Sequence, residues 1–376
     1  MKKSEDIVIV GGGPAGAYCA YELAKNGIYP VIFDNSHPRE KPCGGGLSPL
    51  VLEKYPFMKN VPSKGIFSAK FKIISPSGKE AIAKGERGSF NVSRLQLDKY
   101  ILNMAIKNGA QLIEERVIKV AKEKNLWILK TKKRTLKAKI IVGADGANSL
   151  VRNEILSPIP KKNLGITFGY YASGMEKEDS IIKYLKKNAL YIWIFPRKDH
   201  SSIGIGSGLE YSKTLKVILD NFISTYCPHI KIISKFSAII PLIKDPNFYK
   251  LPCAGENWIL VGDAAGHVDP ITGEGILYAM WGGELAAKAI KNSNPKEFDV
   301  SWRKEYGYDL IEGCKMRDMF YNPFMTELSV ILASRSKTFS HLMYDIITSE
   351  EEYKTFNSRM LREFPRSLIE FIFKKK

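Results

Sequence analysis

Several features that would assign the chain to a large class of proteins are missing from its sequence. It has no run of about 18 uncharged apolar residues, so we expect no transmembrane helix. Its first residues lack the apolar stretch and the small-residue cleavage site of a signal peptide, which favours a cytoplasmic protein. Its five cysteines are widely spaced and form no CxxC pair, so we expect neither a disulfide framework nor a metal site.

Acidic residues are too few to balance the basic ones. The chain has 57 lysines and arginines against 39 acidic residues, which makes the net charge +18. No nucleic-acid recognition motif accompanies this charge, so we expect no nucleic acid partner. The alternative is attraction to anionic lipid headgroups. Segment 361–376 mixes large apolar residues with three final lysines, which fits a peripheral contact with the inner face of the membrane or a terminal helix packed on the body.

Hydrophobic periodicity predicts that strands and helices alternate along the chain. Residues 6–10 and 29–34 have the pattern of buried strands, and residues 14–26 have that of a helix ended by Gly27. We expect further strands at 65–83 (two, joined by a turn at 76–78), 111–120, 126–131, 138–143 and 258–261, and helices at 94–108 and 275–292. Most of residues 160–240 are expected in a second sheet, and residues 296–376 are expected to be mostly helical.

A glycine-rich turn follows the first strand. The segment Gly11-Gly-Gly-Pro-Ala-Gly16 is a GxGxxG motif, and Asp34 closes the second strand 18 residues after Gly16. Gly11 allows the tight turn, Gly13 lets a pyrophosphate approach the backbone, and Gly16 permits close packing of helix on strand. The helix start, which includes Ala15, offers free N–H groups to phosphate, and Asp34 can bind an adenosine ribose. The motif therefore predicts a dinucleotide, but it does not separate FAD from NAD.

Two later segments favour FAD. Residues 140–149 run from a strand into Asp145-Gly, and residues 258–267 run from another strand into Gly-Asp263. With the glycine-rich turn, they resemble the three fingerprints of the FAD-dependent hydroxylase and reductase superfamily, over roughly residues 1–290. The resemblance implies that Asp263 binds the ribityl chain and that the helix opening at Gly273, Gly275 and Ile276 faces the flavin. A helix N-terminus there stabilises the negative charge of reduced flavin.

Three further residues are expected to contact the cofactor. Arg94, at the start of the helix at 94–108, matches the superfamily arginine that reaches the FAD phosphates, and Asp145 belongs to the second fingerprint. Val117, in the strand expected at 111–120, is assigned to the same set of contacts. From the residue types alone, Arg94 can also be a surface helix residue, and Asp145 can also cap a turn.

These motifs imply a discontinuous nucleotide domain. We expect a Rossmann-type FAD-binding domain built from residues 1–64, 88–158 and 252–295. A mixed or antiparallel sheet, residues 65–87 and 159–251, is inserted as the substrate and catalytic domain, and residues 296–376 form a helical C-terminal region. The expected fold class is therefore α/β, or α+β when all parts are counted.

A cysteine followed by three glycines distinguishes the chain within this superfamily. Gly44, Gly45 and Gly46 after Cys43 allow the backbone to lie against a flat ring. The segment resembles that of geranylgeranyl reductases, which hydrogenate isoprenoid double bonds and whose cysteine lies beside the flavin. The resemblance implies that Cys43 is catalytic and that the four residues contact the cofactor. Without the resemblance, Cys43 could be a small buried hydrophobe.

Residues 191–196 place aromatic side chains at alternate positions of a strand. Tyr191, Trp193 and Phe195 share one face, which could be plain core or the wall of a pocket for a long hydrocarbon. The stretch resembles the PxxYxWxFP motif of geranylgeranyl reductases, in which the aromatics wall the substrate cavity. Asn188 stands where that motif has its first proline. The resemblance makes the three aromatic residues the candidate substrate-binding residues.

The resemblance implies an FAD-dependent oxidoreductase that saturates the double bonds of a geranylgeranyl chain on a lipid. Hydride transfer from reduced flavin would be accompanied by a proton that Cys43 donates or positions. The electron donor would be NAD(P)H or reduced ferredoxin, and ferredoxin would be a protein partner. The sequence does not distinguish which group carries the chain: an ether lipid, a (bacterio)chlorophyll precursor, a quinone or a free diphosphate.

Three other activities are alternatives. A flavin monooxygenase would use NAD(P)H and oxygen, and a flavin-containing binding protein or electron carrier would have no alkene chemistry. A flavin halogenase is disfavoured, because its WxWxIP stretch needs Trp and Ile where Tyr191 and Phe195 stand.

Overall fold

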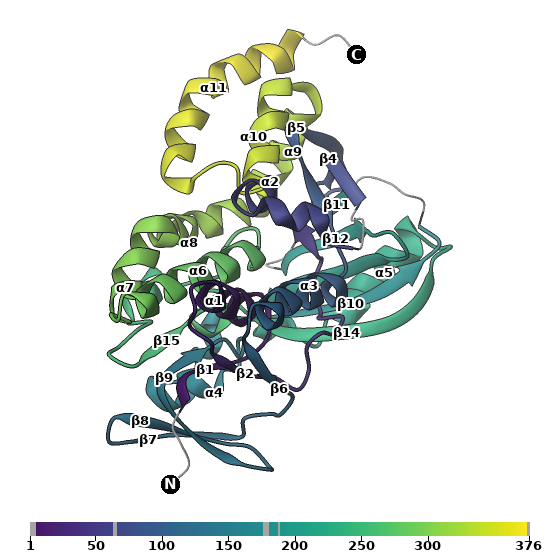
Figure 1. The fold of residues 1–376 in the computed structure, drawn as a ribbon. Coiled ribbons are helices and arrows are strands. Elements are labelled where there is room, and N and C mark those ends of the chain that lie inside the picture. The colour runs from purple at the N-terminus through teal and green to yellow at the C-terminus, as the bar shows by residue number, and fades with distance from the viewer. Residues whose placement is uncertain (1–4, 63–65, 176–179, 187–188, 374–376) are drawn as a thin grey trace.

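The computed structural model describes residues 5–62, 66–175, 180–186 and 189–373. Two sheets form the framework of the molecule, and a group of helices covers one side and extends to the C-terminus (Figure 1). The predicted fold, a Rossmann-type sheet joined to a mixed sheet and a helical C-terminal region, is confirmed.

The first sheet is parallel at its centre. Its strands are β1 (Glu5–Val10), β2 (Val31–Phe33), β6 (Gln111–Ile113), β7 (Lys119–Glu123), β8 (Leu126–Lys130), β9 (Thr135–Gly143) and β15 (Trp258–Leu260). The order is β6-β2-β1-β9-β8-β7, and β15 pairs in parallel with β9. The strand β1 lies in the middle, and its apolar residues are buried on both faces, as parallel sheets require.

Helices pack against this sheet or against one another beside it. They are α1 (Pro14–Lys25), α3 (Arg94–Lys107), α4 (Leu150–Ile155) and α6 (Ile276–Lys291). The helix α1 contacts both α3 and α6 (Figure 1). Pro14 begins α1, and Gly27 follows its end with φ +78°, so the predicted boundaries of this helix are confirmed within about a residue.

The second sheet is mostly antiparallel. Its strands are β3 (Gly46–Leu47), β4 (Ile66–Ile74), β5 (Glu80–Asn91), β10 (Leu164–Ser173), β11 (Ser180–Lys183), β12 (Ala189–Pro196), β13 (Ser201–Gly208) and β14 (Lys231–Pro241). The order is β14-β10-β13-β12-β11-β4-β5-β3, and only the β11–β4 pair among these is parallel. A helix that the sequence analysis missed, α5 (Leu215–Tyr226), packs on one face of β10, β12 and β13.

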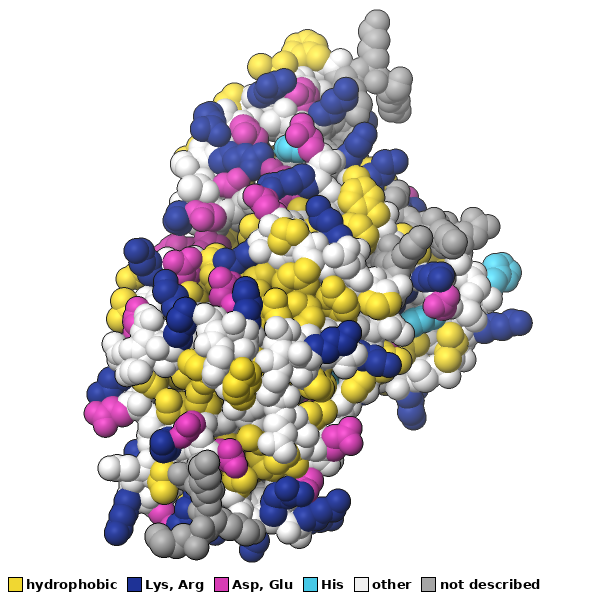
Figure 2. All heavy atoms as spheres, viewed as in Figure 1, with side chains coloured by type: hydrophobic (Ala, Val, Ile, Leu, Met, Phe, Trp, Pro, Cys, Tyr) yellow, Lys and Arg dark blue, Asp and Glu magenta, His cyan; other side chains and the backbone are white. Residues whose placement is uncertain are grey.

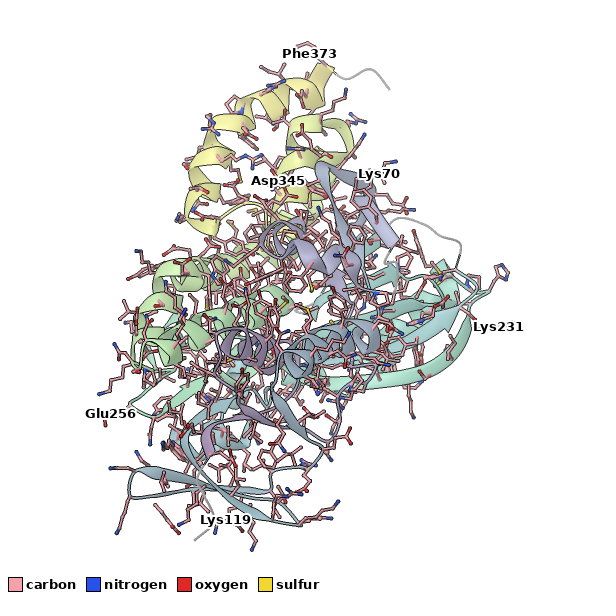
Figure 3. The ribbon with its side chains drawn as sticks, in the orientation of Figure 1. Lys70, Lys119, Lys231, Glu256, Asp345 and Phe373 are labelled. Carbon is pink, nitrogen blue, oxygen red and sulfur yellow. The ribbon has the colours of Figure 1, made fainter. Side chains whose placement is uncertain are left out.

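The remaining helices lie mainly toward the C-terminus. They are α2 (Pro49–Lys54), α7 (Glu297–Trp302), α8 (Tyr308–Phe320), α9 (Pro323–Arg335), α10 (Lys337–Ile347) and α11 (Tyr353–Phe373), with short helices at η1 (Pro56–Asn60), η2 (Lys161–Asn163), η3 (Leu209–Tyr211), η4 (Pro246–Lys250), η5 (Gly262–Ala264) and η6 (Arg303–Gly307). Helices α9 and α10 pack on β5. Figure 3 shows Phe373 of α11 at the opposite end of the molecule from Lys119 of β7. Across the described part of the chain, no helix combines the length and apolarity needed to cross a bilayer.

Two expectations about boundaries need correction or qualification. The prediction of a single strand at 111–120 is wrong. The chain leaves the first sheet after Ile113, where β6 ends, and pairs with it again as β7. The strand β5 continues past the domain boundary expected at residue 87, and β3, expected in the first domain, pairs with β5. The division into domains therefore stays a proposal, in which residues 34–45 lead from β2 of the first sheet to β3 of the second.

Candidate active site

The glycine-rich turn after β1 is too tight for side chains. Gly11 has φ +107°, and a Cβ there would lie 2.2 Å from the carbonyl oxygen of Ala144. A Cβ on Gly16 would lie 2.0 Å from the carbonyl oxygen of Gly11. The N-cap of α1, Gly13, has no side chain to cover the first N–H groups of the helix. This cradle of free N–H groups fits a dinucleotide diphosphate.

Asp34 stands beside this cradle, and the protein itself uses both of its oxygens. Its Oδ2 accepts from the Gly12 N–H at 2.7 Å and lies 2.8 Å from Nδ1 of His37, and its Oδ1 accepts from the backbone N–H groups of Ser36 and His37. The other ring nitrogen of His37 lies 3.3 Å from Asp98. Burial lowers the pKa of His37, but the two aspartates outweigh burial and raise it above 6.5. No local sequence pattern predicted this Asp34–His37–Asp98 chain.

Arg94 and Asp145 are held by protein groups. The guanidinium of Arg94 makes two hydrogen bonds of 2.8 Å to Asp98, one turn along α3. The carboxylate of Asp145 accepts from Ser149 Oγ at 2.5 Å and from the Leu150 N–H at 2.7 Å, which caps α4. Val117 is buried in the core of the first sheet. Their contacts with a cofactor stay predictions.

A second uncapped helix start lies next to the first. Gly262 has φ +58°, and a Cβ there would lie 3.0 Å from the side chain of Ala15, so η5 packs directly on α1. Gly275 is the N-cap of α6 and has no side chain to cover that terminus. Asp263 lies beside Gly275 and 3.5 Å from the ammonium of Lys41. Two free helix N-termini with a carboxylate between them fit the diphosphate, ribityl and flavin parts of FAD.

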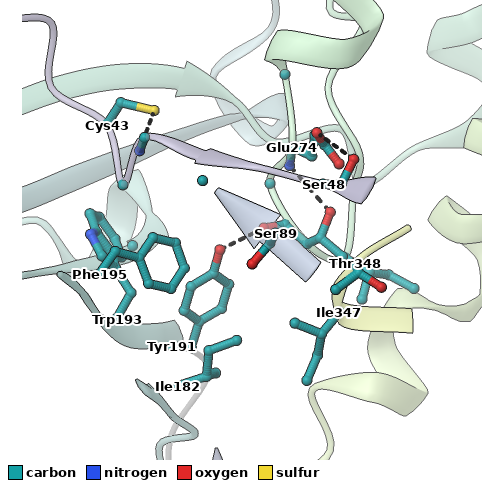
Figure 4. A pocket seen from close by; sticks show the side chains of 18 of the residues that line it. Cys43, Ser48, Ser89, Ile182, Tyr191, Trp193, Phe195, Glu274, Ile347 and Thr348 are labelled. Carbon is teal, nitrogen blue, oxygen red and sulfur yellow. Dashed lines mark hydrogen bonds between the residues drawn. The ribbon is translucent and has the colours of Figure 1, made fainter. Parts of the chain in front are cut away.

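A cavity of about 200 Å³ lies between this cradle and the second sheet (Figure 4). The predicted cofactor residues Cys43, Gly44, Gly45 and Gly46 line one side of it, and residues 272–276 line another. The rest of the wall is largely apolar and is formed by side chains of the second sheet and the C-terminal helices, which include Phe71, Ile182, Tyr184, Phe320, Tyr321 and Ile347.

The predicted aromatic wall faces this cavity. Tyr191 donates to the Thr272 carbonyl at 2.5 Å, and the ring of Phe195 lies against Gly44, where a Cβ would be 2.6 Å away. The Trp193 ring covers Gly204, where a Cβ would lie 2.2 Å from the ring. Residues 192 and 194 point into the opposite core with α5. Position 188, where the motif departs from the family pattern, and the side chain of residue 190 lie outside the described residues.

Cys43 is half-buried at the edge of the cavity. Its sulfur accepts from the Gly45 N–H at 3.3 Å. Its carbonyl accepts from Arg197 at 2.9 Å and from Ser202 Oγ at 3.0 Å. These contacts tie the cysteine loop, residues 42–46, to β13 and to the turn after β12. Gly45 must have no side chain, because it has φ +77° and a Cβ would lie 2.1 Å from the Val92 carbonyl.

Arg197 was not singled out from the sequence. Its Nη1 lies 2.6 Å from Glu40, whose carboxylate also accepts from the Arg94 N–H at the start of α3. Its guanidinium lies over the Tyr171 ring, 5.3 Å from the centroid. Burial tends to raise the pKa of Glu40, but Arg197 and the helix start hold it below its ordinary value. Nothing in the local sequence Phe-Pro-Arg at 195–197 predicts that the arginine contacts Glu40, which is distant in the chain.

Glu274 was also missed, although it stands between the predicted residues Gly273 and Gly275. Its carboxylate lines the cavity and accepts from Ser48 Oγ at 3.2 Å. Burial, with the charge of Asp269, raises its pKa to about 7. The glycines on either side of it predict a turn, and nothing local in the sequence indicates that the acid faces a cavity.

Known oxidoreductases resemble this chain in sequence. Residues 5–182 match the family model of the pyridine nucleotide-disulphide oxidoreductases. The geranylgeranyl diphosphate reductase of Rhodobacter capsulatus is 27% identical, with 96% of this chain and 93% of that protein covered. The digeranylgeranylglycerophospholipid reductase of Methanococcus vannielii is 28% identical, with 89% of this chain and 91% of that protein covered.

Solved structures share the fold. A geranylgeranyl bacteriochlorophyll reductase-like protein from Thermoplasma acidophilum superimposes with a TM-score of 0.79 at 21% identity, covering 96% of this chain and 99% of that one. A flavin-dependent brominase superimposes with a TM-score of 0.74 at 19% identity, covering 97% and 100%. The fold is therefore common to several flavin chemistries. The resemblance predicted from the sequence is confirmed: the chain is a flavoprotein oxidoreductase related to the geranylgeranyl reductases.

Proposed function

We propose that this protein is an FAD-dependent reductase that saturates carbon–carbon double bonds of a geranylgeranyl chain carried by a lipid-like substrate. The observation that carries the proposal is the cavity, which has an apolar aromatic wall on one side and the expected flavin contacts on the other. An extended hydrocarbon needs such a wall, whereas a small polar substrate would need more polar groups. Relatives of this chain that span most of its length are named for geranylgeranyl substrates.

Different helices would hold different parts of FAD. The diphosphate would lie at the free N–H groups of Gly13 and Ala15, and the adenosine ribose at Asp34. Asp263 would bind the ribityl chain, and the start of α6 at Gly275 would face the flavin. When bound and reduced, FAD supplies the hydride that one carbon of the double bond receives.

The chain's own groups would prepare the substrate. Cys43 stands at the boundary between the cofactor cradle and the cavity and would hold the reacting bond in place. The faces of Tyr191 and Trp193 would stabilise positive charge that develops on the alkene, and the apolar wall would exclude water. We propose that Arg94, Val117 and Asp145 also contact the cofactor.

The electron donor would be NAD(P)H or reduced ferredoxin. The decisive experiment is anaerobic: reduce the purified protein with dithionite, add a geranylgeranyl lipid, and follow flavin absorbance and product mass. Reoxidation with a gain of two mass units for each bond would support the reductase. Oxygen-dependent NAD(P)H consumption with a product that gains one oxygen would instead show the monooxygenase.

A lipid substrate also suggests contact with a membrane surface. Leu361, Phe364, Leu368 and Ile372 recur at helical spacing on α11, and all four are exposed. At the tip of α11, hydrophobic side chains lie among Lys and Arg side chains (Figure 2). This mixture suits an anionic bilayer, and we propose that the protein binds peripherally to the inner face of the membrane.

A further inference from the structure

Glu274 is an acidic side chain in an otherwise largely apolar cavity. It belongs to the loop that opens α6, and its backbone N–H donates to Thr272 Oγ1 at 3.2 Å. Figure 4 shows Glu274 and Cys43 near the two ends of β3, both at the cavity. The acid is thus placed beside the path that a hydrocarbon chain would follow past the flavin contacts.

The groups around Glu274 favour its protonated form. Burial raises its pKa to about 7, the nearby charge of Asp269 adds to this, and hydrogen bonds from Ser349 and Ser48 oppose it. None of these groups is a cation. Asp269 is itself buried and is held by the Tyr353 hydroxyl at 2.9 Å.

Two tyrosines also feel the charge of Glu274. These are Tyr191 of β12 and Tyr278 of α6, and burial raises the pKa of both. Both are neutral near pH 7, so they do not stabilise a carboxylate there as a cation would. A carboxylic acid in this setting can hold a proton near neutral pH and release it within the cavity.

We propose that Glu274 is the acid that protonates one carbon of the substrate double bond. This role rests on the proposed function. The π electrons of the double bond form a C–H bond with the proton from the Glu274 carboxyl, and the hydride brings the electron pair for the other C–H bond. The carboxylate then regains a proton from solvent, and the hydride consumed would be replaced by NAD(P)H, or by two electrons from reduced ferredoxin together with a solvent proton. Cys43, in this division, positions the bond and does not supply the proton.

The first test measures the protonation of Glu274 without turnover. Because its folded-state pKa is raised, the acid stabilises the protein at low pH, and this contribution is lost as pH rises toward and past 7. We expect the melting temperature of the FAD-free wild type to fall between pH 5 and 8 more steeply than that of Glu274→Gln. The matched control is Glu284→Gln, an acid on α6 that accepts from the Tyr55 hydroxyl. It should keep the wild-type profile, and a Glu274→Gln profile parallel to wild type would overturn the proposal.

The second test measures the chemistry with a defined probe, geranylgeranyl diphosphate, in anaerobic single turnover. Glu274→Gln should keep its FAD content and its rate of reoxidation by oxygen, while alkene reduction falls about 100-fold or more. Glu274→Asp should recover part of the rate with a shifted pH profile. Wild-type rates in Glu274→Gln would overturn this role alone. If the wild type itself reduced no geranylgeranyl compound, the proposed function would fall, and this role with it.

Discussion

Arg197 and Glu40 form an ion pair, with Nη1 2.6 Å from Oε1, that joins the turn after β12 to the segment preceding the cysteine loop. The side chain of Arg197 is 2% exposed, and the same guanidinium donates to the Cys43 and Gly44 carbonyls. One buried cation therefore controls where the cysteine stands relative to the aromatic strand.

Replacing Arg197 by Met should destabilise the protein by roughly 3 kcal/mol, because it leaves the Glu40 carboxylate without its cation. Chemical unfolding would measure this loss. The control is Lys296→Met, which removes an ion pair of 2.9 Å between two exposed side chains, Lys296 and Glu256, and should cost much less. Equal losses in the two variants would show that the Arg197 pair does not hold the loop.

Replacing Cys43 by Ala should leave FAD binding intact and lower alkene reduction by about 100-fold, since the loop backbone is held by Arg197 and Ser202 rather than by the thiol. Flavin content and anaerobic turnover measure the two effects. Cys227→Ala serves as control and should keep its activity, because Cys227 is a buried core residue at the C-terminal end of α5. Full activity in Cys43→Ala would remove this residue from the mechanism.

Replacing Gly45 by Ala should cost about 3 kcal/mol or more, since a Cβ would lie 2.1 Å from the Val92 carbonyl at φ +77°. Gly78 tests the backbone effect alone, because it has φ +99° and nothing within 4 Å of its Cβ position. Gly78→Ala should therefore cost only about 1–2 kcal/mol. Urea unfolding of the two variants separates the cost of the steric clash from the cost of backbone strain. Similar losses of stability would mean that the loop around Gly45 can shift to relieve the clash.

The charge on His37 should make stability depend on pH. Its pKa is raised above 6.5 in the folded protein, so its contribution is complete below the unfolded-state value and is lost as pH rises through the folded-state value. His37→Gln should thus cost roughly 1–3 kcal/mol at pH 5.5 and less at pH 9. Guanidinium unfolding at both values measures the difference. A loss that is the same at both would mean that His37 is neutral between Asp34 and Asp98.

The exposed stripe on α11 should bind anionic vesicles. Leu361 and Ile372 are 74% and 68% exposed, and replacing both by Asp should weaken sedimentation with phosphatidylglycerol-containing vesicles about 10-fold or more. Val300→Asp changes a side chain of similar exposure, 70%, on α7 and should have no effect. If the wild type failed to bind these vesicles, α11 would be a solvent-exposed helix and nothing more.

The sequence by itself determined the parts of the site that depend on a few neighbouring residues. The turn from Gly11 to Gly16, the end of α1 at Gly27 and the shared face of Tyr191, Trp193 and Phe195 follow from backbone conformation and strand alternation, which are local properties. These motifs also carried the resemblance that the comparisons confirmed.

The tertiary structure decided what depends on distant contacts and burial. Arg197 reaches Glu40 across 157 residues, and β5 runs through a boundary that the motifs had suggested, because the pairing between two strands is not specified by either strand alone. The proton on Glu274 depends on how completely the cavity walls remove water from a carboxyl group. Desolvation and long-range charge arise only when the two sheets and the C-terminal helices come together, so no local pattern can specify them.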